Sequence, residues 1–500
     1  MQPLSGLHVA SLIDPGLFDV RLHHEDWHGP FDVSDCGRFQ LVFLTGLQAD
    51  FDRMRQLSYF FRRSGAIVVA GGSICTLFPE FATRFFDVVC AGGVESVCDV
   101  VDDYVRGDLK TIYTPARSGA PNCKVDYSHF AEHGINPSCH LVEATRGCSF
   151  RCSFCTIPAE GRRHEPYALK SVAEAIDSAL ATSPFFSFRR WYPIVLFLDN
   201  NFSDDVRHML ALCSMLRANK KVRGWGALVT QNTLRDRSLI ATLAQSKCNG
   251  LFVGLESLDR ELLRRTNKTQ NLGRGDVLDD IAYAESKGIG ITYGYLLDPR
   301  HQTAAEMERQ IVAIAHHPRM PMPTYMSVIA PLAGTRTFWE DLKSGHLAPN
   351  LRLRDLDGET IAYSKLADDP AEIVRFIERL FRRPWLVAGR ARILAKTLRR
   401  IARSGTLDPV RWFFLASANL HCFVWSREEI CAARTYLAGS ETLDPQYAER
   451  PPDLSDEDRE RYFTPIALTD PSGGPTDWLK PYFDRQYPSK DADHERESAL

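Results

Sequence analysis

The chain has 500 residues, of which 44% are hydrophobic and 25% are charged, and its formal net charge is −3. This is the composition of a globular protein of roughly two to four domains, and the charge balance gives no sign of a nucleic-acid partner. The first residues lack the features of a signal peptide, and no apolar run approaches the ~20 residues of a membrane span. We therefore expect a cytoplasmic protein with reduced thiols.

The first region, residues 1–110, alternates strand patterns with helix patterns. Runs rich in β-branched and aromatic residues lie at 18–26, 39–46, 66–73 and 87–93, and an amphipathic helix pattern covers 50–65. Such alternation predicts a parallel sheet with helices on both faces. Residues 111–138 carry Pro, Gly and Asn without periodicity and are expected to form a linker.

A second alternating region covers residues 139–335. Its candidate strands lie at 139–147, 192–200, 224–231, 249–257, 288–298 and 324–332. Six strand–helix repeats predict a full or partial barrel, whose chemistry would lie at the C-terminal ends of the strands. Residues 336–435 are mostly helical in pattern, and 436–500 are polar, rich in Pro and Asp, and expected to form an irregular tail.

Three cysteines follow the first barrel strand in the stretch EATRGCSFRCSFCTIP. Cys148, Cys152 and Cys155 are separated by three and then two residues, and Gly147 can open the loop that carries them. A loop of this kind can hold three irons of a [4Fe–4S] cluster through thiolates. The fourth iron would then keep an exchangeable position, so the missing fourth cysteine is itself a functional feature.

Zinc is an alternative reading of these thiols, with His164 as a fourth ligand. Structural zinc sites usually take four ligands in two paired knuckles, and His164 lies in a basic segment instead. Chance clustering is a second alternative. Most of the other ten cysteines lie in apolar segments and are expected to be small core residues.

The CxxxCxxC spacing, with Phe154 before the last cysteine, resembles the radical S-adenosylmethionine (SAM) superfamily. LFLDNNFSDD, LFVGLESLDRELLRRTNKTQN and APLAGTRTFWEDLKSGHL are similar to further segments of that superfamily, so the resemblance covers roughly residues 3–365. The stretch VVAGGSICTLFPEFATRFFDVVCAGGVESV resembles the cobalamin-binding-type Rossmann domain of one branch, which contains hopanoid C-2 methylases. The resemblance implies an α/β fold: a truncated Rossmann-like domain (1–110), a partial (β/α)6 TIM-like barrel (139–335) and a helical C-terminal region.

The sequence departs from that branch at three places. The usual first strand is missing, and there is no DxHxxG motif, whose histidine would ligate cobalt. YGYLLDPRHQT replaces a glycine-rich segment at the far edge of the SAM or substrate site. Gly71, Gly72 and Glu95 could line a cobalamin cleft, or they could turn the chain and start a helix. Cobalamin is therefore an uncertain cofactor at this stage.

The resemblance implies that the three cysteines hold the cluster, that SAM chelates its open iron, and that an external low-potential donor supplies the electron. The residues expected to contact SAM are Phe154, Asp199, Asn200, Asn201, Gln231 and Glu256. Each has an ordinary structural alternative, such as a cap or turn, a salt bridge, or loop packing. Trp225 is expected in the core.

The substrate prediction depends on residues 375–403, which hold ten basic residues and one acidic residue among apolar ones. Such a region can lie on an anionic membrane and would suit a lipid-like or apolar small-molecule substrate, or it can form a helical cap with a solvated basic face. Bound cobalamin would favour C-methylation, and its absence cyclisation, rearrangement or oxidation. A non-catalytic Fe–S scaffold is the hypothesis of another class, and tRNA modification is disfavoured by the near-neutral charge.

Overall fold

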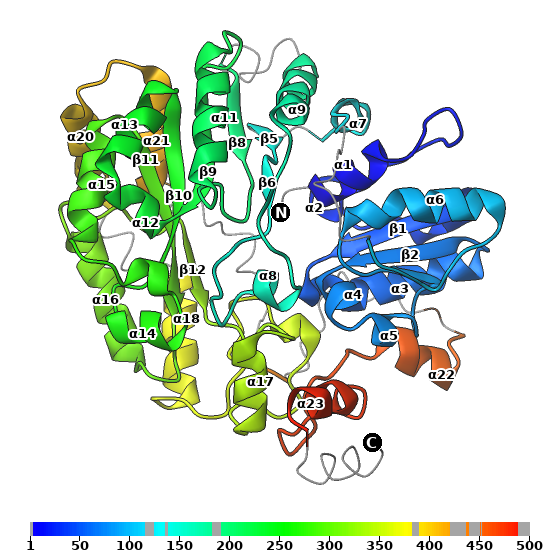
Figure 1. The fold of residues 1–500 in the computed structure, drawn as a ribbon. Coiled ribbons are helices and arrows are strands. Elements are labelled where there is room, and N and C mark those ends of the chain that lie inside the picture. The colour runs from blue at the N-terminus through cyan, green and yellow to red at the C-terminus, as the bar shows by residue number, and fades with distance from the viewer. Residues whose placement is uncertain are drawn as a thin grey trace, which may run out of the picture.

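The computed structural model describes residues 4–115, 125–135, 139–182, 192–382, 390–420, 437–439, 451 and 453–488. Two parallel sheets form its centre, one of four strands and one of six, and helices cover them (Figure 1). The six-stranded sheet curls into a half-barrel, which confirms the α/β class that the sequence predicts. Within the described ranges, every helix is too short or too polar to reach from one side of a membrane to the other.

The four-stranded sheet is made of apolar runs that pair in chain order. Its strands are β1 (Leu41–Gly46), β2 (Ile67–Gly72), β3 (Val88–Cys90) and β4 (Ile112–Tyr113). All three strand pairs are parallel. Helices α3 (Phe51–Arg63) and α6 (Val97–Arg106) connect them, and parallel pairing requires such crossovers.

The strand expected at 18–26 is wrong. After α1 (Leu4–Ser11) the chain runs without regular structure to α2 (Glu25–His28). Phe18, Val20 and Leu22 alternate with polar residues as in a half-exposed strand and are only partly buried, and the segment pairs with no strand of the sheet. The sheet therefore begins at β1 and is truncated, as the resemblance implies. The expected linker 111–138 also holds structure, namely β4 and α7 (Ser128–Glu132).

The half-barrel has the strand order β5-β8-β9-β10-β11-β12, all parallel. The strands are β5 (His140–Val142), β8 (Ile194–Phe197), β9 (Gly224–Thr230), β10 (Cys248–Glu256), β11 (Gly290–Leu297) and β12 (Tyr325–Val328). Each of the six candidate strands of the sequence corresponds to one of them. Its connecting helices include α9 (Leu169–Ala181), α11 (Val206–Ala218), α13 (Arg237–Gln245), α15 (Val277–Ser286) and α16 (Ala304–His316).

Helix α21 (Pro409–Leu420) packs against β10 and β11 near the N-terminal ends of the strands. Gly250 pairs laterally with Gly226 and Gly290, so three neighbouring strands present glycine at one level. A Cβ at Gly250 would lie 2.2 Å from the Phe414 ring, so only glycine leaves room for the helix. The helix therefore fills this end of the sheet and leaves the C-terminal strand ends for the chemistry.

The basic stretch 375–403 falls on α18 (Pro370–Arg382) and α20 (Arg390–Ser404), with residues 383–389 outside the described part. The inner face of α20 is mainly polar: Lys396 Nζ donates to the Ile314 carbonyl at 3.1 Å, and Arg400 pairs with Glu285 of α15 through Nη2, while its Nε and Nη1 make no hydrogen bond within the described residues. This arrangement matches the interpretation as a helical cap. Leu394 and Leu398 stay 53% and 58% exposed on its outer face.

The expectation of an irregular tail over 436–500 needs correction for residues 453–488. This segment contains α22 (Asp456–Asp458), a turn of π-helix at Arg459–Phe463, and α23 (Lys480–Gln486). Its apolar residues, Phe463 and Leu479 among them, are buried in the same cluster as those of α3. Trp478 stacks on Phe81 with ring centroids 3.9 Å apart. The prediction failed because the aromatic residues that pack this segment are few and widely spaced in a polar sequence.

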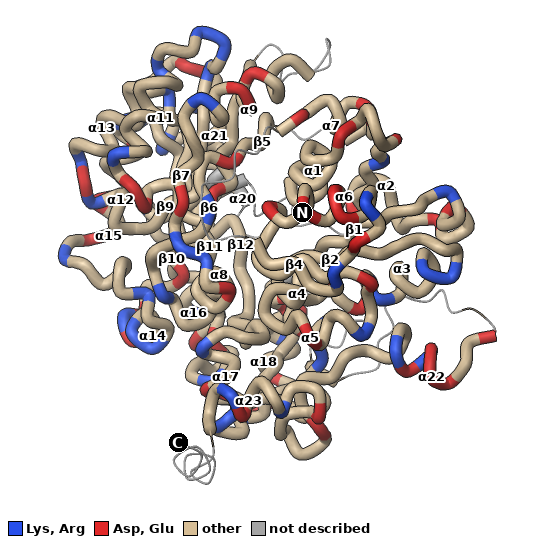
Figure 2. Tube along the Cα trace, turned by 45° about the vertical axis from the view of Figure 1, so that its right-hand side comes forward, with Lys and Arg blue, Asp and Glu red and all other residues tan. Residues whose placement is uncertain are grey.

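The C-terminal ends of the two sheets face each other across the loop that carries the three cysteines (Figure 1). Gln48, after β1, donates to the Ala333 carbonyl at 2.9 Å and accepts from the Ala333 N–H at 2.8 Å. Basic and acidic residues are both spread over the elements in view in Figure 2.

Candidate functional site: three thiols between two sheets

The thiols lie in a loop that a short antiparallel pair closes at its base. β6 (Thr145–Arg146) pairs with β7 (Glu165–Pro166), so residues 147–164 form one excursion. Gly147 opens it with φ +77°, and a Cβ there would lie 1.9 Å from the Arg163 carbonyl oxygen. A residue with a side chain would therefore force the two arms of the loop apart.

The three thiols have different surroundings. Cys152 is buried, whereas Cys148 and Cys155 are partly exposed. The Cys155 N–H donates to the Cys152 carbonyl at 3.2 Å, and Cys155 is the N-cap residue of the short helix α8 (Thr156–Ala159). Burial, and then the neighbouring thiols, raise the pKa of Cys155 to about 12. This thiol therefore needs a cationic partner to be held as a thiolate.

Two side-chain amides donate to these sulfur atoms. Asn201 Nδ2 lies 3.8 Å from Cys148 Sγ, and Gln270 Nε2 lies 3.4 Å from Cys152 Sγ. Donors of this type stabilise negative charge on cluster sulfur. Among the described residues, the thiols do not form a group whose ligand atoms all lie within 4.8 Å of one another. A single zinc would bring its sulfurs to about 3.8 Å, so the wider spacing fits a cluster better.

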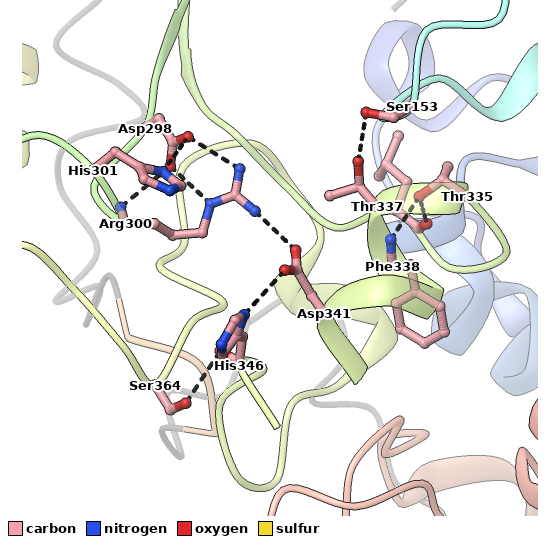
Figure 3. A network of polar contacts seen from close by, with 11 residues as sticks. Ser153, Asp298, Arg300, His301, Thr335, Thr337, Phe338, Asp341, His346 and Ser364 are labelled. Atoms are coloured by element: carbon pink, nitrogen blue, oxygen red, sulfur yellow. Dashed lines mark hydrogen bonds and ion pairs between the residues drawn. The ribbon is translucent and has the colours of Figure 1, made fainter. Parts of the chain in front are cut away.

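The segment after β10 fastens the thiol loop from the other side. The Ser153 N–H donates to the Thr266 carbonyl at 3.0 Å, and Asn267 Nδ2 donates to the Arg151 carbonyl at 2.7 Å. Thr337 of α17 (Arg336–Lys343) also bonds Ser153, through its hydroxyl at 2.9 Å (Figure 3). The loop is thus held to the half-barrel between two of its thiols.

The three polar residues after β8 support this loop. Asp199 is fully buried, and its two oxygens accept from the Ala144 N–H at 2.8 Å and the Thr145 hydroxyl at 3.0 Å. Asn200 accepts from the Gly147 N–H at 2.9 Å and remains exposed. Asn201 is buried and bonds Cys148. The expected SAM acceptors are therefore brought together, but Asp199 already has two internal donors.

Asp199 gives the protein a testable pH dependence. Burial raises its pKa to about 8, although the hydrogen bonds from Ala144 and Thr145 oppose the shift. Since the unfolded carboxyl has its ordinary pKa of about 4, folding takes up a proton, and stability falls as the pH rises through this window. Asp199→Asn should remove on the order of 4 kcal/mol of this pH dependence between pH 5 and pH 8. Urea unfolding at about pH 5 and pH 8 measures it, and parallel curves for both proteins would contradict the assignment.

Glu256 ends β10 in an unusual conformation, with φ +61°. Left-handed backbone at a non-glycine residue costs free energy and often marks a functional position. Its carboxylate accepts from Lys268 Nζ at 2.8 Å, and its other oxygen lies 4.0 Å from where a Cβ at Gly294 of β11 would be. Glu256 therefore lies at the C-terminal end of the half-barrel strands, where the sequence predicts the active site.

Sequence reasoning did not select Lys268 and Gln270, although both lie in the segment that resembles the superfamily. Lys268 is buried and lies 5.8 Å from the centroid of the Phe154 ring. Burial lowers the pKa of Lys268, but Glu256 and the thiols of Cys152 and Cys155 overcome this effect and raise it. The structure therefore places a permanent positive charge beside the thiol loop.

The remaining candidates have mainly structural contacts. Trp225 is fully buried, and its Nε1 donates to the Ser246 carbonyl at 2.8 Å, as expected of a core residue. Gln231 is buried at the start of α12 (Gln231–Arg235), directly after β9. Gly72 has φ +106° and turns the chain against the carbonyl of Gly46.

Glu95 links the four-stranded sheet to the thiol loop. It pairs with Arg146 at 3.1 Å, one residue before the loop opens, and Arg146 also pairs with Glu143 at 2.9 Å. His8 of α1 contacts Arg146 Nη2 through Nδ1 at 2.6 Å, and burial, followed by the charge of Arg146, lowers the pKa of His8 to about 3. A neutral His8 can accept this hydrogen bond, so the ion pairs of Arg146 and one hydrogen bond to His8 hold the junction.

A second polar network follows β11, in the segment that departs from the resemblance. Arg300 pairs with Asp298 at 2.8 Å and with Asp341 of α17 at 2.8 Å, and His301 contacts Asp298 at 3.1 Å (Figure 3). Although burial opposes it, pairing with His301 and Arg300 lowers the pKa of Asp298 to about 2. This network fixes α17, whose first turn carries the Thr337 that holds the thiol loop.

Comparisons with known proteins agree with this geometry. Residues 142–308 match the model of the radical SAM superfamily. The chain is 23% identical over 354 residues to a bacteriochlorophyllide d C-8(2)-methyltransferase of Chlorobaculum tepidum, covering 68% of this chain and 76% of that protein. A C-12(1)-methyltransferase of the same organism is 25% identical over 276 residues, covering 54% of this chain and 59% of that protein.

Solved structures show the same fold at low identity. The radical SAM methyltransferase TsrM from Kitasatospora setae, with cobalamin and a [4Fe–4S] cluster bound, aligns with a TM-score of 0.53 and 17% identity, covering 70% of this chain and 77% of TsrM. The cobalamin-dependent radical enzyme OxsB aligns with a TM-score of 0.57 and 13% identity, covering 85% and 70%. A radical SAM domain implies a [4Fe–4S] cluster and SAM as cofactors. The chain therefore contains a radical SAM domain over residues 142–308, and the curated proteins that it resembles include methyltransferases.

Proposed function

We propose that this protein uses a [4Fe–4S] cluster held by Cys148, Cys152 and Cys155 to cleave SAM and to functionalise an unactivated carbon. The observation that carries the proposal is the loop itself: three thiols in one glycine-opened excursion, with amide donors from Asn201 and Gln270 at two of the sulfurs. When bound and reduced, such a cluster supplies one-electron cleavage of SAM. The protein's own residues orient the reactants and exclude water.

The neighbouring residues are suited to bind SAM. Asn200 is the exposed member of the group after β8 and offers an amide, and Glu256 offers a carboxylate at the end of β10. Phe154 offers a ring for the adenine, with the Lys268 ammonium 5.8 Å from its centroid. Gln231, the first residue of α12, offers a further amide directly after β9. Asp199 acts through the loop, since its oxygens accept from Ala144 and Thr145.

C-methylation with cobalamin is the outcome we propose first. The curated relatives are named as methyltransferases of bacteriochlorophyllides, and the solved structures of similar fold hold cobalamin. In support of this, Gln48 after β1 bonds Ala333 after β12, and Glu95 after β3 pairs with Arg146 next to the thiol loop, so the two sheets meet near the loop. A corrinoid between the two sheets would therefore lie beside the site of SAM cleavage.

We further propose a lipid-like or apolar substrate, with peripheral contact to a membrane. Leu394 and Leu398 of α20 are about half exposed, and Trp412 and Phe413 of α21 are 37% and 53% exposed. Basic residues accompany these side chains on α20, which has no acidic residue. Apolar side chains next to basic ones suit an anionic lipid surface.

The deciding experiment is an anaerobic product assay. The purified protein, with its iron and corrinoid content measured, is reduced with dithionite and supplied with SAM. We expect 5′-deoxyadenosine, and S-adenosylhomocysteine in addition if a corrinoid is present. 5′-Deoxyadenosine alone would favour cyclisation, rearrangement or oxidation instead of methylation. A full cluster with SAM but no 5′-deoxyadenosine would refute the proposal and favour a non-catalytic Fe–S scaffold.

A further inference from the structure

Helix α7 (Ser128–Glu132) lies apart from the thiol loop, on the connection between the two sheets. Its apolar side packs into the half-barrel core through Phe130 and the preceding Tyr127. The Tyr127 hydroxyl donates to the Leu141 carbonyl of β5, and the Asp126 N–H donates to Ser11 Oγ at 2.9 Å. The helix is thus fixed to both α1 and the first barrel strand, which gives its polar side a defined position.

Three potential metal ligands gather on that polar side. His129, Glu132 and His133 occupy positions i, i+3 and i+4, which share one face of a helix. One ligand atom from each lies within 4.8 Å of the other two, and no other such group of three His, Cys, Asp or Glu occurs among the described residues. The Glu132 side chain is 61% exposed and His129 is 12% exposed, so an ion could reach the group from solvent.

The imidazoles are oriented as metal ligands usually are. His133 Nδ1 lies 2.8 Å from the His129 carbonyl, so this nitrogen carries the hydrogen and Nε2 keeps its lone pair. His129 Nδ1 is buried and makes no hydrogen bond within the described residues, and it lies 3.7 Å from the Glu132 carboxylate. A cation between these groups would satisfy a nitrogen that otherwise has only a weakly placed partner.

We propose that His129, Glu132 and His133 form a binding site for a divalent cation of the zinc type. Two imidazoles and a carboxylate favour zinc and similar transition metals over magnesium or calcium, which prefer oxygen ligands. The fourth position would be taken by water. His28 Nε2 contacts the His133 carbonyl at 2.7 Å, so the ion would also stiffen the contact between α2 and α7. This site is independent of the proposed radical chemistry.

Zinc binding to the full-length protein tests the proposal. Equilibrium dialysis with Zn²⁺, followed by metal analysis, is performed on the wild type, on His129→Ala and His133→Ala, and on the control His316→Ala, which removes an exposed histidine of α16. We expect one tight equivalent in the wild type and the control, and at least a tenfold weaker affinity in the two variants. Circular dichroism verifies that each variant is folded.

Zinc bound to the cluster cysteines must be distinguished from zinc at α7. The triple variant Cys148→Ala/Cys152→Ala/Cys155→Ala should therefore keep the tight equivalent, whether or not the wild type holds a cluster. Loss of that equivalent in the triple variant, together with unchanged binding in His129→Ala and His133→Ala, would overturn the α7 site. A wild type with no tight zinc would overturn it as well.

Discussion

Replacing Cys152 with alanine is expected to abolish cluster binding and all reductive cleavage of SAM. Cys152 is the buried thiol of the three, and Gln270 donates to it at 3.4 Å. The two remaining thiols supply only two of the three protein ligands that the cluster needs. We expect iron and acid-labile sulfide to fall to background after anaerobic reconstitution, and 5′-deoxyadenosine to become undetectable.

Cys213→Ala is the matched control, because it removes another buried thiol, from helix α11 outside the thiol loop. It should cost about 1 kcal/mol of stability and leave iron content unchanged. If Cys152→Ala retained a full cluster and product formation, the assignment of the three cysteines would be wrong. If both variants lost the cluster, the loss in Cys152→Ala would reflect folding and not ligation.

Replacing Lys268 with methionine is expected to make the cluster harder to reduce. Lys268 is buried beside Cys152 and Cys155, and reduction adds negative charge to that place. Removing the ammonium while keeping the length of the side chain should shift the one-electron equilibrium at least tenfold toward the oxidised state, or about 59 mV. Electron paramagnetic resonance during a redox titration measures this shift separately from activity.

Lys287→Met is the control for charge, since this lysine lies on the exposed surface, over the Tyr283 ring. Its removal should leave the midpoint potential unchanged because solvent screens distant charges. A second control, Glu256→Gln, removes the partner of Lys268 and should shift the potential upward. An unchanged potential in Lys268→Met, with normal iron content, would show that Lys268 serves only to hold Glu256.

The sequence by itself determined the general plan of the protein. Apolar runs that alternate with amphipathic helix patterns predict two parallel sheets covered by helices, because the helices bury their apolar faces against the sheets. The spacing of Cys148, Cys152 and Cys155 predicts a three-thiol loop, and Gly147 has the residue type that its φ of +77° requires. These features are local, because each is determined by residues close together in the sequence.

Local patterns failed where a segment is stabilised only by distant parts of the chain. The segment 18–26 has the alternation of a strand but pairs with no strand of the sheet. The tail at 453–488 has an irregular composition, but its Trp478 stacks on Phe81. The position of α21 was not foreseen either, since it depends on glycines that lie side by side only after three strands have paired.

Only the tertiary structure decided which polar residues contact the thiols and which make internal hydrogen bonds. Lys268 and Gln270 approach the thiols because the segment after β10 folds back across the loop, and more than 100 residues separate it from Cys152. The two oxygens of Asp199 accept hydrogen bonds from Ala144 and Thr145. These contacts cannot be predicted from the spacing of residues in the sequence. Burial and charge at a site are sums over groups that are distant in the chain, so they exist only once the chain has folded.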